Sequence, residues 1–141
     1  MTPGIKGNKA IEDAAVEFVI AFERHAGRDP RDTRNTGAAA DIESSGRVIE
    51  VKAAAGSIRN AGFVYLEPRQ VEEARANPNF FIYLVENIGP GFTSEFQLRI
   101  LGGERLRRLV DRVKERRYFE LPVPVSEHDA LLVEETRNRS T

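Results

Sequence analysis

Two acids and a lysine near the middle of the chain have residue types and a spacing that suit phosphate chemistry. Asp41 is followed, after eight intervening residues, by Glu50-Val51-Lys52. Between them, Ser45-Gly46 has the character of a two-residue hairpin loop, and the pairing set by such a loop would place Asp41 opposite Glu50. Because side chains alternate along a strand, both acids and Lys52 would project from one surface, and the apolar residues between them would face the core.

The opposed acids indicate a divalent cation. Two carboxylates directly across a strand pair have Cβ atoms about 5 Å apart and repel each other. Mg²⁺ suits such a pair, because it prefers oxygen ligands and usually takes one or two protein carboxylates. The Val51 carbonyl could complete the site, with Mn²⁺ as a substitute metal, and Lys52 could position water or stabilise charge on a phosphate. The alternative is an ordinary hairpin whose outer face is solvated.

The motif resembles that of a nuclease superfamily. Asp41 and Glu50-Val51-Lys52 resemble the signature of the restriction-endonuclease-like PD-(D/E)XK superfamily, and residues 7–88 more narrowly resemble the NO VEIN C-terminal domain. The segments that carry the narrower resemblance are Glu12 and Glu23 on a first helix, residues 41–42, 49–52, 66–74 and 80–86. The resemblance implies a Mg²⁺-dependent endo- or exodeoxyribonuclease in which one helix glutamate assists the metal, directly or through water. It favours Glu12 over Glu23, and both could instead be solvated helix residues.

The chain departs from these relatives on both sides of the motif. Residues 38–40 are alanines where relatives commonly carry proline or an aromatic residue before the aspartate, and residues 53–55 are alanines where relatives often carry hydroxyl groups. An alternative is therefore a non-cutting module that binds nucleic acid or a protein partner. Gln70 occupies a helix where related nucleases place a glutamine or glutamate near the active centre, and its alternative is a surface polar residue.

Hydrophobic rhythm predicts the elements that would position these residues. Residues 8–25 have the apolar spacing of an amphipathic helix that ends at Gly27, and Pro68 suits the start of a helix that Asn77-Pro78 stops. Residues 80–85 are nearly all apolar and suit a central strand, residues 63–66 suit a short strand or extended segment, and residues 95–101 alternate as another strand. The order predicts an α/β fold with a mixed central β-sheet flanked by helices, as in a restriction-endonuclease-like core.

A basic helix is the candidate surface for nucleic acid. Residues 104–117 have a helical rhythm with Leu106, Leu109, Val110 and Val113 as the stripe expected to be buried. The residues that would form a phosphate-binding ridge on its outer side are Arg105, Arg108, Arg112 and Arg116. The alternative is a solvated helix face whose arginines pair with Asp111 and Glu115.

Length and composition bound the remaining possibilities. The 141 residues, 40% hydrophobic and 30% charged, predict one domain over residues 1–141, with a core at about 7–120 and a C-terminal tail at 121–141. The net charge of −1 means that affinity for DNA would come from a local patch. The chain has no cysteine, and we expect a cytoplasmic protein without a signal peptide or membrane span. A homodimer would be compatible with catalysis, since many nucleases of the superfamily pair.

Overall fold

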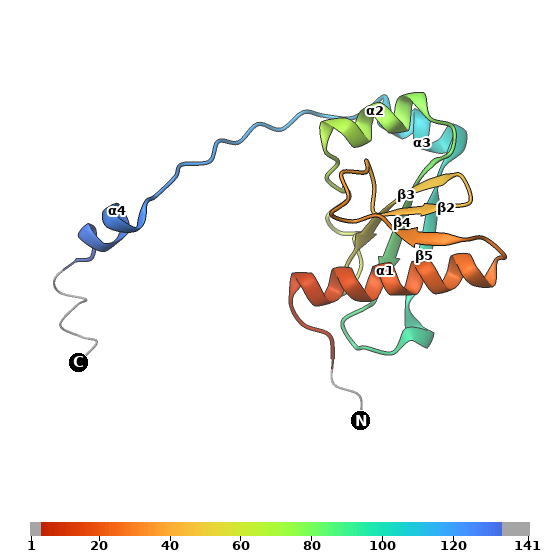
Figure 1. Ribbon diagram of the computed structural model, residues 1–141, viewed down its shortest axis with the longest axis horizontal. Coiled ribbons are helices and arrows are strands. Elements are labelled where there is room, and N and C mark those ends of the chain that lie inside the picture. Colours follow the sequence, from red (N-terminus) through yellow and green to blue (C-terminus); the bar gives the residue numbers. More distant parts are fainter. Residues whose placement is uncertain (1–3, 134–141) are drawn as a thin grey trace.

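A computed structural model describes residues 4–133 and shows a mixed five-stranded sheet with helices on both faces, which confirms the predicted fold class (Figure 1). The sheet order is β1-β2-β3-β4-β5, with β3 and β4 parallel and the other neighbours antiparallel. The strands are β1 (Pro30–Asp32), β2 (Ile42–Ser44), β3 (Arg47–Ala53), β4 (Phe80–Glu86) and β5 (Gln97–Leu101). The helices are α1 (Asn8–His25), α2 (Pro68–Ala76), the 3₁₀ turn η1 (Thr93–Glu95), α3 (Gly103–Val110) and α4 (Val125–Ala130).

The predicted hairpin between β2 and β3 is confirmed in its register. Ile42 pairs with Ile49 and Ser44 with Arg47, so that the loop is Ser45-Gly46. Ser45 and Gly46 have φ values of 46° and 88°, and positive φ at both positions is what a type I′ turn requires. β1, which the sequence did not predict, adds to the outer edge of β2. It was missed because this short charged stretch shows no alternation of apolar and polar residues.

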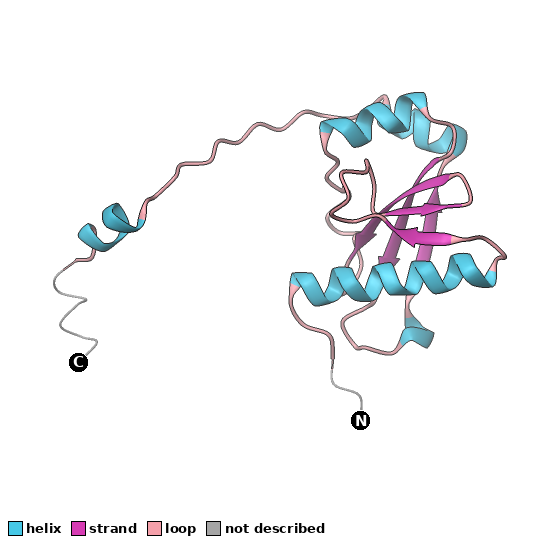
Figure 2. Cartoon of the chain, in the orientation of Figure 1, coloured by secondary structure: helices cyan, strands magenta, loops and turns pink. Residues whose placement is uncertain are grey.

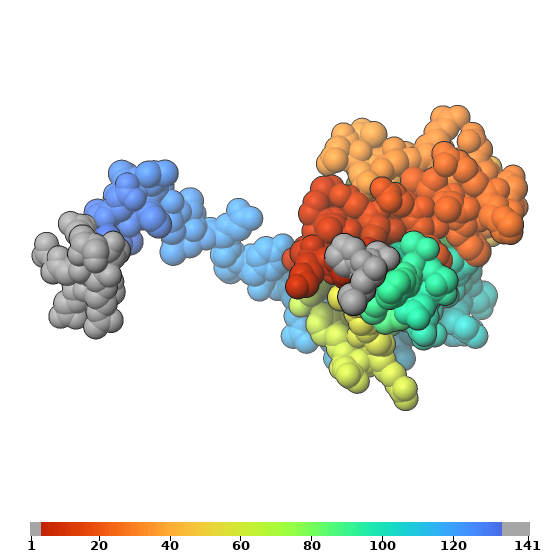
Figure 3. Space-filling model, turned by 90° about the horizontal axis from the view of Figure 1, so that it is seen from below, coloured from red at the N-terminus to blue at the C-terminus, as the bar shows by residue number. Residues whose placement is uncertain are grey.

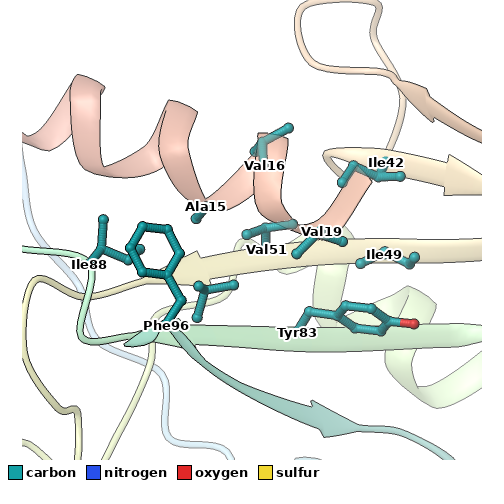
Figure 4. Packing of buried hydrophobic residues seen from close by; sticks show 10 residues of the cluster. Ala15, Val16, Val19, Ile42, Ile49, Val51, Tyr83, Ile88 and Phe96 are labelled. Atoms are coloured by element: carbon teal, nitrogen blue, oxygen red, sulfur yellow. The ribbon is translucent and has the colours of Figure 1, made fainter. Parts of the chain in front are cut away.

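The sheet carries a separate apolar core on each face. The first lies under α1 and includes Val16, Val19, Ile49 and Tyr83 (Figure 4). The second lies under α2 and α3, and its residues are Ala40, Ala74, Phe80, Ile82, Leu106 and Val110. β4 contributes to both, which confirms the prediction of a strand buried on two faces. Alternation along β3 therefore decides which residues point toward α1 and which toward α2 and α3.

α1 and α2 begin where the sequence predicted, but the basic helix was predicted too long. α3 ends at Val110 instead of Arg117. Leu106 and Val110 are buried against the second core, whereas Leu109 and Val113 are exposed. A helix is held mainly by burial of its apolar face, and the turns after Val110 have no such face to bury.

Three smaller predictions also change. Of the two alternatives for residues 63–66, a short strand or an extended segment, the strand is absent, and β5 begins at Gln97 because η1 takes up residues 93–95. Every described residue from Asp111 to Val133 is exposed, and the short helix α4, absent from the sequence prediction, lies in this segment (Figure 2). Of the predicted C-terminal tail at 121–141, residues 134–141 lie outside the described residues. None of the helices between residues 4 and 133 combines the length and apolarity needed to span a bilayer.

Candidate metal centre

Asp41 lies immediately before β2, and its carboxylate reaches across to the middle of β3. Its Oδ2 accepts a hydrogen bond from the Val51 backbone N–H at 2.9 Å, while its own backbone oxygen accepts one from Thr33 N–H at 2.8 Å. The β2–β3 ladder starts one residue later, at Ile42, so the pair formed by Asp41 and Glu50 is a side-chain arrangement next to the ladder. These contacts orient the aspartate toward the strand that carries the other two motif residues.

Glu50 is a buried carboxylate with an incompletely satisfied side chain. It is only 6% exposed, and its Oε1 has no hydrogen-bond partner among the residues that the structure describes. Burial, and after it the neighbouring negative charge of Asp41, raise the pKa of Glu50 to about 7 against the opposing effect of Lys52. A buried polar atom without a partner is costly, and two adjacent carboxylates add repulsion. Positive charge beside the two carboxylates would relieve both costs.

Lys52 supplies part of that charge. Its Nζ lies 3.2 Å from Glu50 Oε2, and its side chain is about one-quarter exposed. Glu50 and Lys52 project from the face of β3 that carries α2 and α3, since the intervening Val51 side chain packs in the first core. The N–H and C=O of one strand residue point to the same side, so the Val51 carbonyl faces the side on which Asp41 lies. The structure thus brings together the four predicted groups of the motif.

The glutamate that was predicted to assist the metal is held elsewhere. Glu12 lies on α1, which packs on the sheet face opposite to Glu50 and Lys52, and its Oε1 is 3.4 Å from Arg34 Nη1. Arg34 also binds Asp13 at 2.8 Å. Within residues 4–133, no hydrogen bond or ion pair joins Glu12 to the motif, and no group of three acidic, histidine or cysteine side chains is placed to hold a metal.

The other helix glutamate, Glu23, is a buried structural group. Its two carboxylate oxygens accept hydrogen bonds from Arg28 Nε and Nη2, both at 2.6 Å, and the Tyr83 hydroxyl donates to it at 3.0 Å. Burial opposes ionisation, but the Arg28 and Tyr83 hydrogen bonds hold the pKa of Glu23 below its ordinary value. Glu23 therefore anchors the end of α1 to β4 and is already satisfied by a cation of the chain.

A family comparison supports the order of elements described above. The family model described as "Protein NO VEIN, C-terminal" matches residues 11–100, from the first helix to the last strand of the sheet. The chain belongs to this family. No curated protein and no solved structure matches it significantly. The matched part of this NO VEIN C-terminal domain contains the whole acid pair and ends before α3.

In this NO VEIN C-terminal domain, Gln70 lies inside the protein on α2. It is buried, and its Oε1 accepts a hydrogen bond from the Glu67 backbone N–H at 3.0 Å, which caps the start of the helix. The neighbouring Arg69 was missed by the sequence analysis. Its Nη1 donates to the Gly37 carbonyl at 2.6 Å and so ties α2 to the loop that leads into Asp41. No sequence pattern marks such a contact, because it joins residues 32 positions apart.

The predicted arginine ridge is only partly present. Arg105 and Arg108 lie on α3, on the same side of the sheet as Glu50 and Lys52. Arg112 follows the helix and lines a surface hollow together with these two arginines. Arg116 lies in the exposed segment beyond the helix, so the prediction of four arginines on one helical ridge is wrong. The reason is the early end of α3, which removes the helical periodicity after Val110.

Proposed function

We propose that this NO VEIN C-terminal domain is a Mg²⁺-dependent nuclease that hydrolyses DNA phosphodiester bonds, with a site of the PD-(D/E)XK kind. The observation that carries the proposal is the state of Glu50. This carboxylate is buried beside Asp41, keeps one oxygen without a partner, and has a pKa raised to about 7. Lys52 pairs with one oxygen of this carboxylate, and a bound cation would give the other oxygen the partner that it lacks.

The residues present fit a hard divalent cation. Asp41, Glu50 and the Val51 carbonyl offer oxygen ligands only, and two carboxylates match the small protein contribution that Mg²⁺ usually accepts. Mn²⁺ would be a substitute. When bound, such a metal would polarise a phosphate oxygen and lower the pKa of a bound water. Glu12 is not in this ligand set as the structure stands, because Arg34 holds it.

Lys52 has the position expected of a group that handles the nucleophile. Its ion pair with Glu50 keeps the ammonium at the rim of the acid pair, and its partial exposure leaves donor hydrogens for water or a phosphate oxygen. Asp41 is kept in place by the Val51 N–H, so two of the three side chains are fixed before substrate arrives. Preorganised charge of this kind is effective where negative charge develops in the transition state.

DNA is the proposed substrate because the resemblance to the nuclease superfamily implies it. A phosphodiester would reach the acid pair from the side that carries α2 and α3. Arg105 and Arg108 of α3 lie on this side and, with Arg112, could neutralise phosphates. Contacts of arginine with phosphates fix position without identifying bases. We therefore expect recognition of nucleic-acid structure rather than of a base sequence.

A cleavage assay with Mg²⁺ and Mn²⁺ on several DNA forms tests the proposal. Lys52→Ala and Asp41→Ala should each lower the cleavage rate at least about 100-fold, in the range found for removal of a charge-stabilising or acid–base group. Glu43→Ala is the matched control, since Glu43 is an exposed acid on the same hairpin and should keep wild-type activity. Equal rates in all four proteins, or contaminant-level cleavage throughout, would refute the catalytic role.

A non-cutting module that binds nucleic acid or a protein partner is the second candidate, and the engagement of Glu12 by Arg34 favours it. The alanines at 53–55 point the same way. Metal titration separates the two functions. A site that binds Mg²⁺ should raise the melting temperature as metal is added, by the usual linkage of binding to stability, and Asp41→Ala should remove this rise. A module that has lost its metal would show no rise in either protein.

A further inference from the structure

The exposed segment after α3 contains a regular alternation that neither the fold nor the proposed function uses. The apolar residues at odd positions are Phe119, Leu121, Val123 and Val125, the last of which is also the first residue of α4. The residues between them are Glu120, Pro122 and Pro124. Phe119 is 92% and Leu121 85% exposed. In an extended conformation all the odd side chains project from one face, so the segment would form a strand with one apolar face.

Because of its two prolines, this strand can form backbone hydrogen bonds with a neighbouring strand along one edge only. Backbone N–H and C=O groups also alternate between the two edges of a strand, and Pro122 and Pro124 both belong to the same edge. Proline has no N–H to donate, so this edge cannot pair with another strand. The other edge belongs to Phe119, Leu121 and Val123, which keep every donor and acceptor. Residues 119–125 are thus built to sit at the outside of a sheet.

β5 offers a free edge of matching character. It is the last strand of the sheet and pairs only with β4 among the described strands. Ala54 N–H donates to Val85 O, so the odd-numbered residues of β4 face β3 and the even-numbered ones face β5. Leu84 pairs with Arg99, so that Arg99 faces β4. The two neighbours of Arg99 in β5 are Leu98 and Ile100. Because backbone groups alternate between the two edges of a strand, the N–H and C=O groups of these two residues point outward.

The side chains at this free edge are apolar and incompletely covered. Leu98 packs against the first core, and Ile100 lies on the same face of β5 but is 45% exposed. Phe22 of α1, which packs edge-to-face on the neighbouring Tyr83, is 37% exposed. A further strand with an apolar face toward α1 would cover these residues. The opposite edge of the sheet is poorer, because β1 has three residues and two of them are charged.

Chirality fixes the direction of such a strand. In L-residues the strand direction and the side-chain face together determine to which edge the N–H points. The odd residues of segment 119–125 can direct their side chains toward the α1 face and their backbone groups toward β5 only if the segment runs antiparallel to β5. In this orientation Glu120 lies on the face of Arg99, whose guanidinium already pairs with Glu86 but is 62% exposed and so could meet a second carboxylate.

We propose that residues 119–125 pair antiparallel with the β5 edge of a second copy of this chain, in a reciprocal two-fold exchange. The segment leaves its own domain and extends away from it, as Figures 1 and 3 show, so it is placed to reach another copy rather than its own β5. An exchange of identical segments gives a closed dimer in which each copy donates one strand and accepts one. The inference does not depend on nuclease activity.

Proline placement supplies the sharpest test. Leu121→Pro blocks the pairing edge, whereas Glu120→Pro adds a third proline to the edge that already has two. Light scattering after size-exclusion chromatography should show a concentration-dependent dimer for wild type and Glu120→Pro, and a dissociation constant raised at least about tenfold for Leu121→Pro. The melting temperature of dilute protein should be the same in all three, because these residues contact nothing in the domain.

Cross-linking identifies the surfaces. The chain has no cysteine, so Ile100→Cys and Leu121→Cys can be introduced singly and joined by a short thiol cross-linker after mixing. A cross-link between the two single variants is expected. Val123→Cys should likewise cross-link to Ile100→Cys, and adding Leu121→Pro to the Val123→Cys chain should suppress that cross-link. A chain that carries both Ile100→Cys and Leu121→Cys serves as a further check. A monomer at every concentration, a cross-link that forms only within this one chain, or a dimer whose dissociation constant is unchanged by Leu121→Pro would overturn the proposal.

Discussion

Replacing Glu50 with glutamine should change the pH dependence of stability in a defined direction. The carboxyl of Glu50 has its pKa raised to about 7 in the folded protein by burial and by the charge of Asp41. In the unfolded chain it ionises near its ordinary value of 4.5. A group with a raised pKa holds its proton more tightly in the folded state, so folding stability falls as the pH rises from about 4.5 to 7 and then levels off.

The size of the effect follows from the shift. One pKa unit corresponds to about 1.4 kcal/mol, so ionised Glu50 should cost the metal-free protein about 3 kcal/mol at pH 8 relative to acid. Glutamine is nearly isosteric and has no charge. Glu50→Gln should therefore gain stability relative to wild type across this interval, on top of a pH-independent offset from burying an amide.

Urea unfolding between pH 4.5 and 8.5 in the presence of a chelator measures this difference. Subtracting the wild-type free energy of unfolding from that of Glu50→Gln cancels the titration of groups that the two proteins share. Glu43→Gln is the control on the same hairpin, and because Glu43 is exposed its difference should be flat. In an additional series with Mg²⁺, the metal should recover much of the penalty in wild type and none in Glu50→Gln.

If the difference in free energy of unfolding between Glu50→Gln and wild type does not change with pH in chelator, ionised Glu50 does not destabilise the fold. The physical basis of the proposed metal site would then be lost. If this difference changes with pH as expected but Mg²⁺ does not stabilise wild type, the raised pKa of Glu50 stands and the proposed metal binding is refuted. The pH dependence thus tests the buried charge of Glu50, and the Mg²⁺ response tests metal binding independently.

Two further substitutions test the packing that positions the site. Gly102→Ala should destabilise the fold by about 1–3 kcal/mol, because the new Cβ would overlap the Phe81 ring. Gly56→Ala is the control, and with open space around its new methyl group it should change stability by no more than about 0.5 kcal/mol. Chemical denaturation measures both free energies of unfolding, and equal values would contradict this explanation. Arg28→Ala should cost about 3 kcal/mol at pH 7 by leaving Glu23 buried without its cation. Because Glu23 has a lowered pKa, this loss should shrink as the pH falls below the ordinary range of glutamate, and a pH-independent loss would argue for packing alone.

Much of the fold could be predicted from the sequence because its elements are encoded by short-range patterns. The apolar rhythm of α1, the Ser45-Gly46 turn and the unbroken apolar run of β4 each lie within one window of chain, and all three are confirmed. The length of the basic helix was predicted wrongly for the same reason. Its helical rhythm of apolar residues continues past Val110, but the second core ends there. Periodicity tells which face would be buried, not whether anything is there to cover it.

For the candidate site, the sequence by itself determined that Glu50 and Lys52 share one face of β3, since side chains alternate along a strand. Asp41 lies just before the ladder, and its side chain is brought to β3 by the hydrogen bond from Val51 N–H. Only the tertiary structure decided what that surface is like. Burial of Glu50 in the folded chain and the nearby charge of Asp41 raise its pKa, and α1 carries Glu12 on the opposite face of the sheet, where it pairs with Arg34. Burial and long-range ion pairs depend on residues far apart in the chain, and these set the electrostatics from which any chemistry must come.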